Sequence, residues 1–174
     1  MINTRTILSL ILLTIAGVGT LIYFLSRKEE PHVSREYTEI QMLSAAIESY
    51  KTDHGHSPTD PATTEQLKPN TSFDPVAYIP SSAFLCRSLS GDNKAAETPD
   101  APKPKRYCVF PPGMLKKSDS GLTYIVDRSG NSLGYSTFKS AHPNSPDGNN
   151  PTFDLWSTGG GTSAEDKSKW YQNW

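Results

Sequence analysis

Residues 34–54 read SREYTEIQMLSAAIESYKTDH, and this stretch decides the fold. Apolar side chains recur along it at steps of three and four residues, which is the period of an amphipathic helix. Ser34 is suited to cap the start of the helix, and Gly55 is suited to end it in a left-handed turn. The apolar stripe consists of Tyr37, Ile40, Leu43, Ile47 and Tyr50. The pattern predicts a helix with one face packed against a small head.

A long apolar run precedes this helix. Ile7–Leu25 contains no charged residue, and as a helix rising about 1.5 Å per residue it would span nearly the whole ~30 Å hydrocarbon core of a bilayer. The run continues past Gly17-Val18-Gly19, where a signal peptidase would find small residues, and this favours an anchor over a cleaved signal peptide. We therefore expect residues 1–33 to hold a transmembrane anchor and its joint, and residues 34–174 to form the head. The positive charges on the two sides of the run are nearly balanced, so the expectation that the head is extracytoplasmic rests on the two cysteines and on the family resemblance described below.

The head separates into two parts by composition. Residues 55–120 are polar and rich in Pro and Gly, which predicts a variable loop region after the helix of residues 34–54. Residues 121–174 contain short stretches of alternating β-forming residues, and these predict an antiparallel sheet. A small sheet needs cover on one face, and the apolar stripe of the helix supplies it. The expected fold is therefore α+β: a long N-terminal helix, transmembrane and then amphipathic, packed on a small antiparallel β-sheet.

Composition and motifs argue against several classes of function. The chain of 174 residues has a formal net charge of −1 and no basic cluster longer than Lys103-Pro104-Lys105-Arg106, so no nucleic-acid partner is expected. Its four histidines lie in or beside polar loops, without a Gly-x-Ser-x-Gly, His-Glu-x-x-His or phosphate-cradling glycine pattern. We expect no enzyme, no catalytic residue and no small-molecule substrate. The C-terminal aromatic residues either stack on a sugar or cover the end of the sheet; they are Trp156, Trp170, Tyr171 and Trp174.

Two cysteines, Cys86 and Cys108, lie beyond the apolar run. In an oxidising compartment they predict a disulfide, which would contribute about 3 kcal/mol by restricting the unfolded chain. Two separate buried thiols are the alternative. The pair does not indicate a metal site, because no Cys-x-x-Cys or paired-His spacing accompanies it.

Four segments carry recognisable motifs. Residues 50–59 read YKTDHGHSPT, residues 127–135 read DRSGNSLGY, residues 153–159 read FDLWSTG, and the chain ends in Asn-Trp. In this order they resemble signatures of the major pseudopilin of type II secretion systems, a family of type IV pilin-like proteins. The family patterns are Tyr-Lys-x-Asp-Asn-Gly-x-Tyr-Pro-Thr, Asp-Pro-Trp-Gly-x-Pro-Tyr (degraded here), Tyr-Asp-Leu-x-Ser-x-Gly and a terminal Asn-Trp.

The resemblance implies a structural subunit of a type II secretion or related pilus-type assembly that exports proteins. It further implies a single-pass protein of the bacterial inner membrane with its head in the periplasm, and other pseudopilin or secretion-system subunits as partners. The N-terminus departs from the family, since it has no Gly-Phe peptidase site and carries Arg5 in place of a glutamate. The alternative is a membrane-anchored binding module for a glycan or calcium that does not assemble into a filament.

In that family the loop after the Asp-Leu-x-Ser strand binds Ca²⁺ through backbone carbonyls and acidic side chains, and Ca²⁺ takes six to eight oxygen ligands. The resemblance therefore carries a candidate calcium site to Leu155, Ser157, Glu165 and Asp166. Gly161 stands where the family has an aspartate. A solvated acidic loop without an ion is the other interpretation. Asp154 is interpreted as a strand-end or turn residue and not as a ligand.

Overall fold

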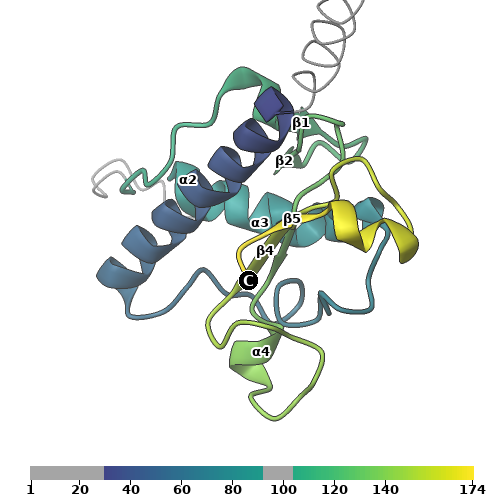
Figure 1. The fold of residues 1–174 in the computed structure, drawn as a ribbon. Coiled ribbons are helices and arrows are strands. Elements are labelled where there is room, and N and C mark those ends of the chain that lie inside the picture. Colours follow the sequence, from purple (N-terminus) through teal and green to yellow (C-terminus); the bar gives the residue numbers. More distant parts are fainter. Residues whose placement is uncertain (1–29, 92–103) are drawn as a thin grey trace, which may run out of the picture. The chain divides into compact units, whose positions relative to one another are not determined.

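The computed structural model describes residues 30–91 and 104–174 (Figure 1). The apolar run Ile7–Leu25, predicted to cross the membrane, lies outside the described residues. Within the described part of the chain, no helix is both long and apolar enough to span a bilayer. The chain divides into two compact units, Met1–Arg35 and Glu36–Trp174. The head is the second of these.

The head belongs to the α+β class, as predicted, and combines helices with two small antiparallel sheets. The helices are α2 (Glu30–His54), α3 (Ile79–Ser90) and α4 (Phe138–Ala141), with short 3-10 turns η1 (Pro75–Tyr78), η3 (Pro112–Met114) and η4 (Glu165–Lys169). The strands are β1 (Leu115–Lys117), β2 (Thr123–Ile125), β3 (Gly134–Ser136), β4 (Asp154–Ser157) and β5 (Tyr171–Gln172). This set of elements confirms the strands expected after residue 121, although they do not form one sheet.

The strands pair in the orders β1-β2 and β3-β4-β5. Strand β2 pairs with β1, which lies in the part predicted to be loop, and only the isolated bridge between Val126 and Ser132 links it toward β3. In the second sheet, Tyr135 pairs with Leu155 and Ser157 with Tyr171. The C-terminus thus lies beside β4 (Figure 1). The central strand β4 is buried along its whole length.

Helix α2 buries the predicted face except at its first position. Its backbone is already helical before Ser34, so Ser34 does not cap it. Ile40, Leu43 and Ile47 are buried as expected, but Tyr37 is 53% exposed and Glu36 is only 8% exposed. The reason is geometric: Glu36 falls in line with the other three at helical spacing, whereas Tyr37 is turned about 100° away from it. A carboxyl group therefore occupies the first position of the apolar stripe.

Helix α3 lies in the region predicted to be loop, and that prediction is wrong. Asp74 accepts a hydrogen bond from the backbone N–H of Val76 at the start of η1, and Pro80 occupies the first turn of α3, where a proline is tolerated. Gly91, with φ of 75°, ends the helix in the left-handed conformation. Asp74, Pro80 and Gly91 are residue types typical of loops, but here they mark the start and the end of helical structure.

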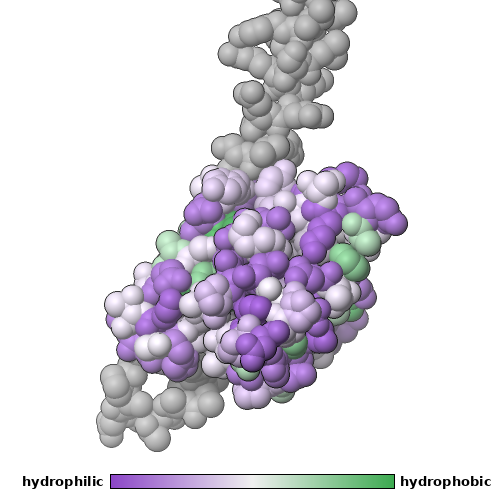
Figure 2. Space-filling model, turned by 60° about the horizontal axis from the view of Figure 1, so that its bottom comes forward, coloured by the Kyte–Doolittle hydropathy of each residue, from purple (hydrophilic) through white to green (hydrophobic). Residues whose placement is uncertain are grey.

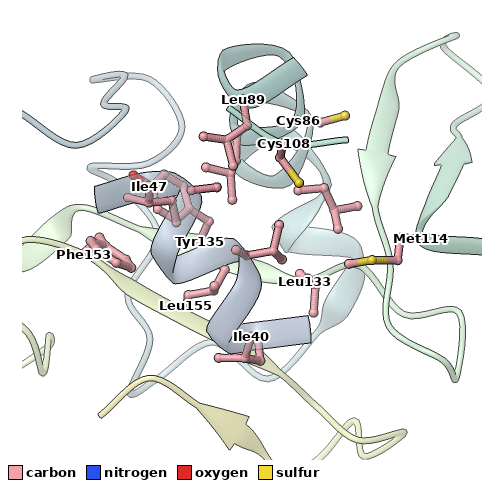
Figure 3. Close-up of a cluster of buried hydrophobic side chains, with 14 residues drawn as sticks. Ile40, Ile47, Cys86, Leu89, Cys108, Met114, Leu133, Tyr135, Phe153 and Leu155 are labelled. Atoms are coloured by element: carbon pink, nitrogen blue, oxygen red, sulfur yellow. The ribbon is translucent and has the colours of Figure 1, made fainter. Parts of the chain in front are cut away.

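The core joins both helices to the second sheet (Figure 3). Its buried members come from α2, α3, β2, β3, β4 and their neighbouring segments: Ile40, Leu43, Ala46, Ile47, Leu85, Cys86, Leu89, Cys108, Met114, Ile125, Leu133, Tyr135, Phe153 and Leu155. A second cluster consists of Leu67, Tyr78, Trp156 and Trp170. Burial of such side chains contributes about 1.5–3 kcal/mol each, so these two clusters supply most of the driving force for folding of the head.

The surface shown in Figure 2 is mainly hydrophilic, with small separate hydrophobic areas. Among the described residues, the large apolar side chains that remain exposed are Tyr37, Val76, Val109 and Leu122. Scattered exposed apolar residues are usual on soluble domains.

Candidate functional site

The end of α2, where the first family-like motif lies, anchors a distant segment of the chain. The carboxylate of Asp53 accepts hydrogen bonds from Lys105 Nζ at 2.5 Å and from the Tyr107 hydroxyl at 2.8 Å. His54 Nε2 lies 3.1 Å from the Tyr107 hydroxyl, and the His54 ring stacks on Tyr50 with centroids 4.0 Å apart. These hydrogen bonds lower the pKa of Asp53, while desolvation and the bond to Asp53 raise the pKa of Tyr107 to about 12. The motif fixes the chain around Tyr107 to the helix end.

The loop that follows α2 is tied to strand β3. The Tyr135 hydroxyl donates to the carbonyl of Pro58 at 2.6 Å, and Tyr135 is fully buried. The hydroxyls of Thr64 and Thr137 lie 2.8 Å apart, and the backbone N–H of Thr137 donates to the carbonyl of Thr64. Buried polar groups are stable only when they are hydrogen-bonded, so these pairs hold the loop in one place.

Asp127 forms the buried centre of the turn between β2 and β3. Its carboxylate accepts hydrogen bonds from the backbone N–H of Asn131 at 2.9 Å and from the Ser157 hydroxyl at 2.9 Å. Burial raises the pKa of Asp127, and these donors act in the opposite direction because they favour the charged form. The degraded Asp-Pro-Trp-Gly-like turn and the Asp-Leu-x-Ser-like strand are thus joined by a direct side-chain bond.

Glu36 is a buried carboxyl near the start of α2. Burial raises its pKa, the charge of Asp127 adds to that effect, and the charge of Arg128 opposes it. The helical spacing of Glu36 with Ile40 and Leu43 was the signal that would have placed it on the core face.

The four candidate calcium ligands lie in two elements. Leu155 and Ser157 belong to β4, and Glu165 and Asp166 belong to η4. The Leu155 carbonyl accepts a hydrogen bond from the Asn173 backbone N–H at 3.1 Å, and the Ser157 hydroxyl donates one to the Asp127 carboxylate. The described part of the chain contains no group of three or more His, Cys, Asp or Glu side chains placed to hold a metal ion.

Both carboxylate oxygens of Asp166 also have protein partners. Lys169 Nζ lies 2.6 Å from Oδ1, and the Ser163 hydroxyl donates to Oδ2 at 3.0 Å. Lys169 and Ser163 together lower the pKa of Asp166. Calcium needs several free oxygens, some of them charged. Both oxygens of Asp166 are thus engaged by protein groups, while Glu165 is exposed.

Asp154 is a turn residue, as predicted. Its two carboxylate oxygens accept hydrogen bonds from the backbone N–H groups of Asn149 and Asn150 at 2.9 Å and 2.8 Å. Asp154 is almost fully buried, and this raises its pKa. The side chain closes the loop that leads into β4.

Cys86 and Cys108 are both buried thiols of the main core (Figure 3). Cys86 lies on α3 one turn before Leu89, and the backbone N–H of Cys108 donates to the Leu89 carbonyl at 3.1 Å. The segments that carry the two cysteines are therefore held together without a covalent bond. Burial raises the pKa of the Cys108 thiol, which makes it less reactive. A disulfide between them stays a prediction.

The C-terminal tryptophans cover the end of the second sheet. Trp156 and Trp170 are buried and stack with ring centroids 6.3 Å apart and an interplanar angle of 8°. Trp174 packs edge-on against Trp156 at 6.0 Å. The Trp156 ring lies over Gly134 on the neighbouring strand, where an added Cβ would come within 1.9 Å of the ring. The buried rings of Trp156 and Trp170 cannot stack on a sugar and instead cover the sheet, whereas Tyr171 and Trp174 are only partly buried.

Comparison of the chain with protein-family models, with curated proteins and with solved structures found no match.

Proposed function

We propose that this protein is a structural subunit, resembling the major pseudopilin, of a type II secretion or related pilus-type assembly. Ile7–Leu25 anchors it in the bacterial inner membrane as a single helix, and the head of residues 34–174 lies in the periplasm. Its partners are other pseudopilin or secretion-system subunits. It contributes to protein export by packing with them, without catalysis.

One observation carries the proposal: the segments that resemble the family bond to one another across the fold. The Ser157 hydroxyl of the strand motif bonds to Asp127 of the turn motif at 2.9 Å. The terminal Asn173 bonds to Leu155 of the strand motif through its backbone N–H at 3.1 Å and its side-chain oxygen at 2.8 Å. These contacts support the proposal, because they bring the motif segments together within one head.

Helix α2 has a face suited to contact with neighbouring subunits. Opposite the buried stripe it exposes Tyr37, Gln41, Ala45 and Glu48. Ala45 is small, which lets a second helix approach closely, and Tyr37 is the kind of half-apolar side chain that is enriched at interfaces. This face supports side-by-side packing of subunits.

The proposal is tested by affinity purification of the tagged full-length protein from detergent-solubilised membranes of its native bacterium. We expect other pseudopilin-like or secretion-system subunits in the eluate, identified by mass spectrometry. A control variant carries Leu12→Arg and Leu13→Arg, which cost roughly 5–7 kcal/mol of membrane insertion and should remove those partners. A matched variant with Leu12→Ile and Leu13→Ile should keep them. Recovery of the wild-type chain alone, as a membrane-bound monomer, would contradict the proposal and favour the anchored binding module.

A further inference from the structure

The loop of residues 158–170 contains a lysine that pairs with an aspartate of the same loop. Lys169 reaches back along η4 and places its Nζ atom 2.6 Å from Asp166 Oδ1. The other oxygen of Asp166 accepts the Ser163 hydroxyl at 3.0 Å. The most acidic part of the loop is therefore neutralised and hydrogen-bonded by side chains of the same loop.

The start of the loop packs directly against η4. A Cβ atom added to Gly161 would lie 2.3 Å from the Cβ of Asp166, and one added to Gly159 would lie 2.6 Å from the Lys169 carbonyl oxygen. Both distances are shorter than the van der Waals contacts that a Cβ makes with a carbon or an oxygen atom. Position 161 is the one where the pseudopilin family has an aspartate, so the close packing leaves no room for the carboxylate that a metal would need.

A second lysine fastens η4 to the rest of the head. Lys167 Nζ lies 3.2 Å from the side-chain oxygen of Asn70 and 5.9 Å from the centre of the Trp170 ring. Trp170 is buried in the aromatic cluster with Trp156. These contacts hold the η4 end of the loop against the head.

We propose that Lys169 supplies, from within the chain, the positive charge that a calcium ion supplies in the pseudopilin family, so that this loop is closed without a metal ion. Lys169 pairs with Asp166, the close packing of Gly161 excludes a further carboxylate, and Lys167 with Trp170 holds the loop against the head. The proposal goes beyond the proposed function and does not depend on whether the chain assembles, because it concerns the folding of the head alone.

The first test is thermal unfolding of the full-length protein in detergent, followed by tryptophan fluorescence, in millimolar calcium and in excess EGTA. A calcium site filled at about 100 times its Kd would raise Tm by roughly 10 °C. We expect equal Tm values in the two solutions. A rise of several degrees in calcium, with none in magnesium, would overturn the proposal.

The second test asks whether Lys169 acts as the cation. Lys169→Met should lower Tm by about 1–3 °C, because the side chain is largely exposed and such ion pairs are weak. Lys169→Arg should restore the wild-type Tm. Lys117, an exposed lysine on β1, provides the matched control, and Lys117→Met should leave Tm unchanged. If Lys169→Met melts at the same temperature as the wild type, the proposed role of Lys169 is wrong.

The third test places the family's residue in the loop. Gly161→Asp should lower Tm equally in calcium and in EGTA, because the new side chain collides with Asp166 and adds a like charge beside it. The control is Gly113→Asp, since a Cβ at Gly113 meets nothing within 4 Å, and this variant should melt like the wild type. If calcium restores the stability of Gly161→Asp, the loop is a calcium site that lacks one ligand, and the proposal fails.

Discussion

The bond between Ser157 and Asp127 is the contact whose removal tests the fold most sharply. Ser157 lies on the buried strand β4, and its hydroxyl donates to the Asp127 carboxylate at 2.9 Å. The change Ser157→Ala deletes this donor without adding volume. Asp127 keeps its bond from the Asn131 backbone but remains buried with one fewer partner.

The loss of folding stability expected for Ser157→Ala follows from the charge and burial of the acceptor, the Asp127 carboxylate. A hydrogen bond to a charged group contributes about 1.5–3 kcal/mol, which for a domain of this size corresponds to a fall in Tm of roughly 3–12 °C. The loss should depend on pH. Burial raises the folded pKa of Asp127 above its ordinary 3.8, so stability falls as the pH rises through that folded pKa. The Ser157 hydroxyl favours the ionised form, so its removal costs more at neutral pH than below pH 3.8.

The assay is urea unfolding of the wild type, Ser157→Ala, Asp127→Asn and the double variant at neutral and acidic pH. These four proteins form a double-mutant cycle, which should give a coupling energy between Ser157 and Asp127 on the order of 1 kcal/mol or more at neutral pH. The coupling energy should be smaller in acid. Ser49→Ala is the control, because the Ser49 hydroxyl is exposed and bonds only to its own helix. If Ser157→Ala is as harmless as Ser49→Ala at neutral pH, the contact does not hold the two motifs together and the reasoning fails.

Three further variants test other parts of the structure. Gly134→Ala should destabilise the head by about 3 kcal/mol or more in urea unfolding, because the Cβ of the new alanine would meet the Trp156 ring at 1.9 Å. A variant nearly as stable as the wild type would contradict the described packing. Glu36→Gln should be more stable than the wild type at neutral pH, because burial raises the pKa of Glu36 and its ionisation therefore destabilises the folded state. The difference in stability should vanish as the pH falls through 4.5, where the carboxyl becomes protonated in the unfolded chain as well. Equal stability of the two proteins at every pH would refute this. Protein extracted from membranes and denatured without reductant should resist alkylation at Cys86 and Cys108 until it is reduced, and replacement of both by serine should cost about 3 kcal/mol. Two thiols that alkylate on denaturation alone would exclude the disulfide.

Periodicity made part of the fold predictable. The helix ending at His54 and the strands β2, β3 and β4 follow from spacing and β-forming residues, and the role of Asp154 follows from its place at the start of a strand. These are features that local sequence determines directly. The family-like motifs were also visible in the sequence, but their contacts with one another were not.

Other features depended on tertiary structure. Helix α3 was missed because its serines and prolines are typical of loops, yet the Ser82 hydroxyl bonds to both the carbonyl and the N–H of Ile125 at 3.0 Å and is stable in the core for that reason. The burial of Glu36 was not predicted, because a carboxyl in an apolar stripe contradicts the usual preference. The partners of Asp166 were missed because a sequence shows an acidic loop but not which lysine reaches it.

The central claim is that this chain assembles with copies of itself or with related subunits. Crosslinking in the membrane tests this claim most directly. A photo-reactive phenylalanine analogue at Tyr37, which is exposed on α2, would be irradiated in intact cells of the native bacterium. We predict a ladder of crosslinked subunits that is lost with Leu12→Arg and Leu13→Arg and kept with the corresponding isoleucine changes. A protein that reaches the membrane normally and yields only the monomer, at Tyr37 and at the neighbouring exposed position Gln41, would contradict the claim.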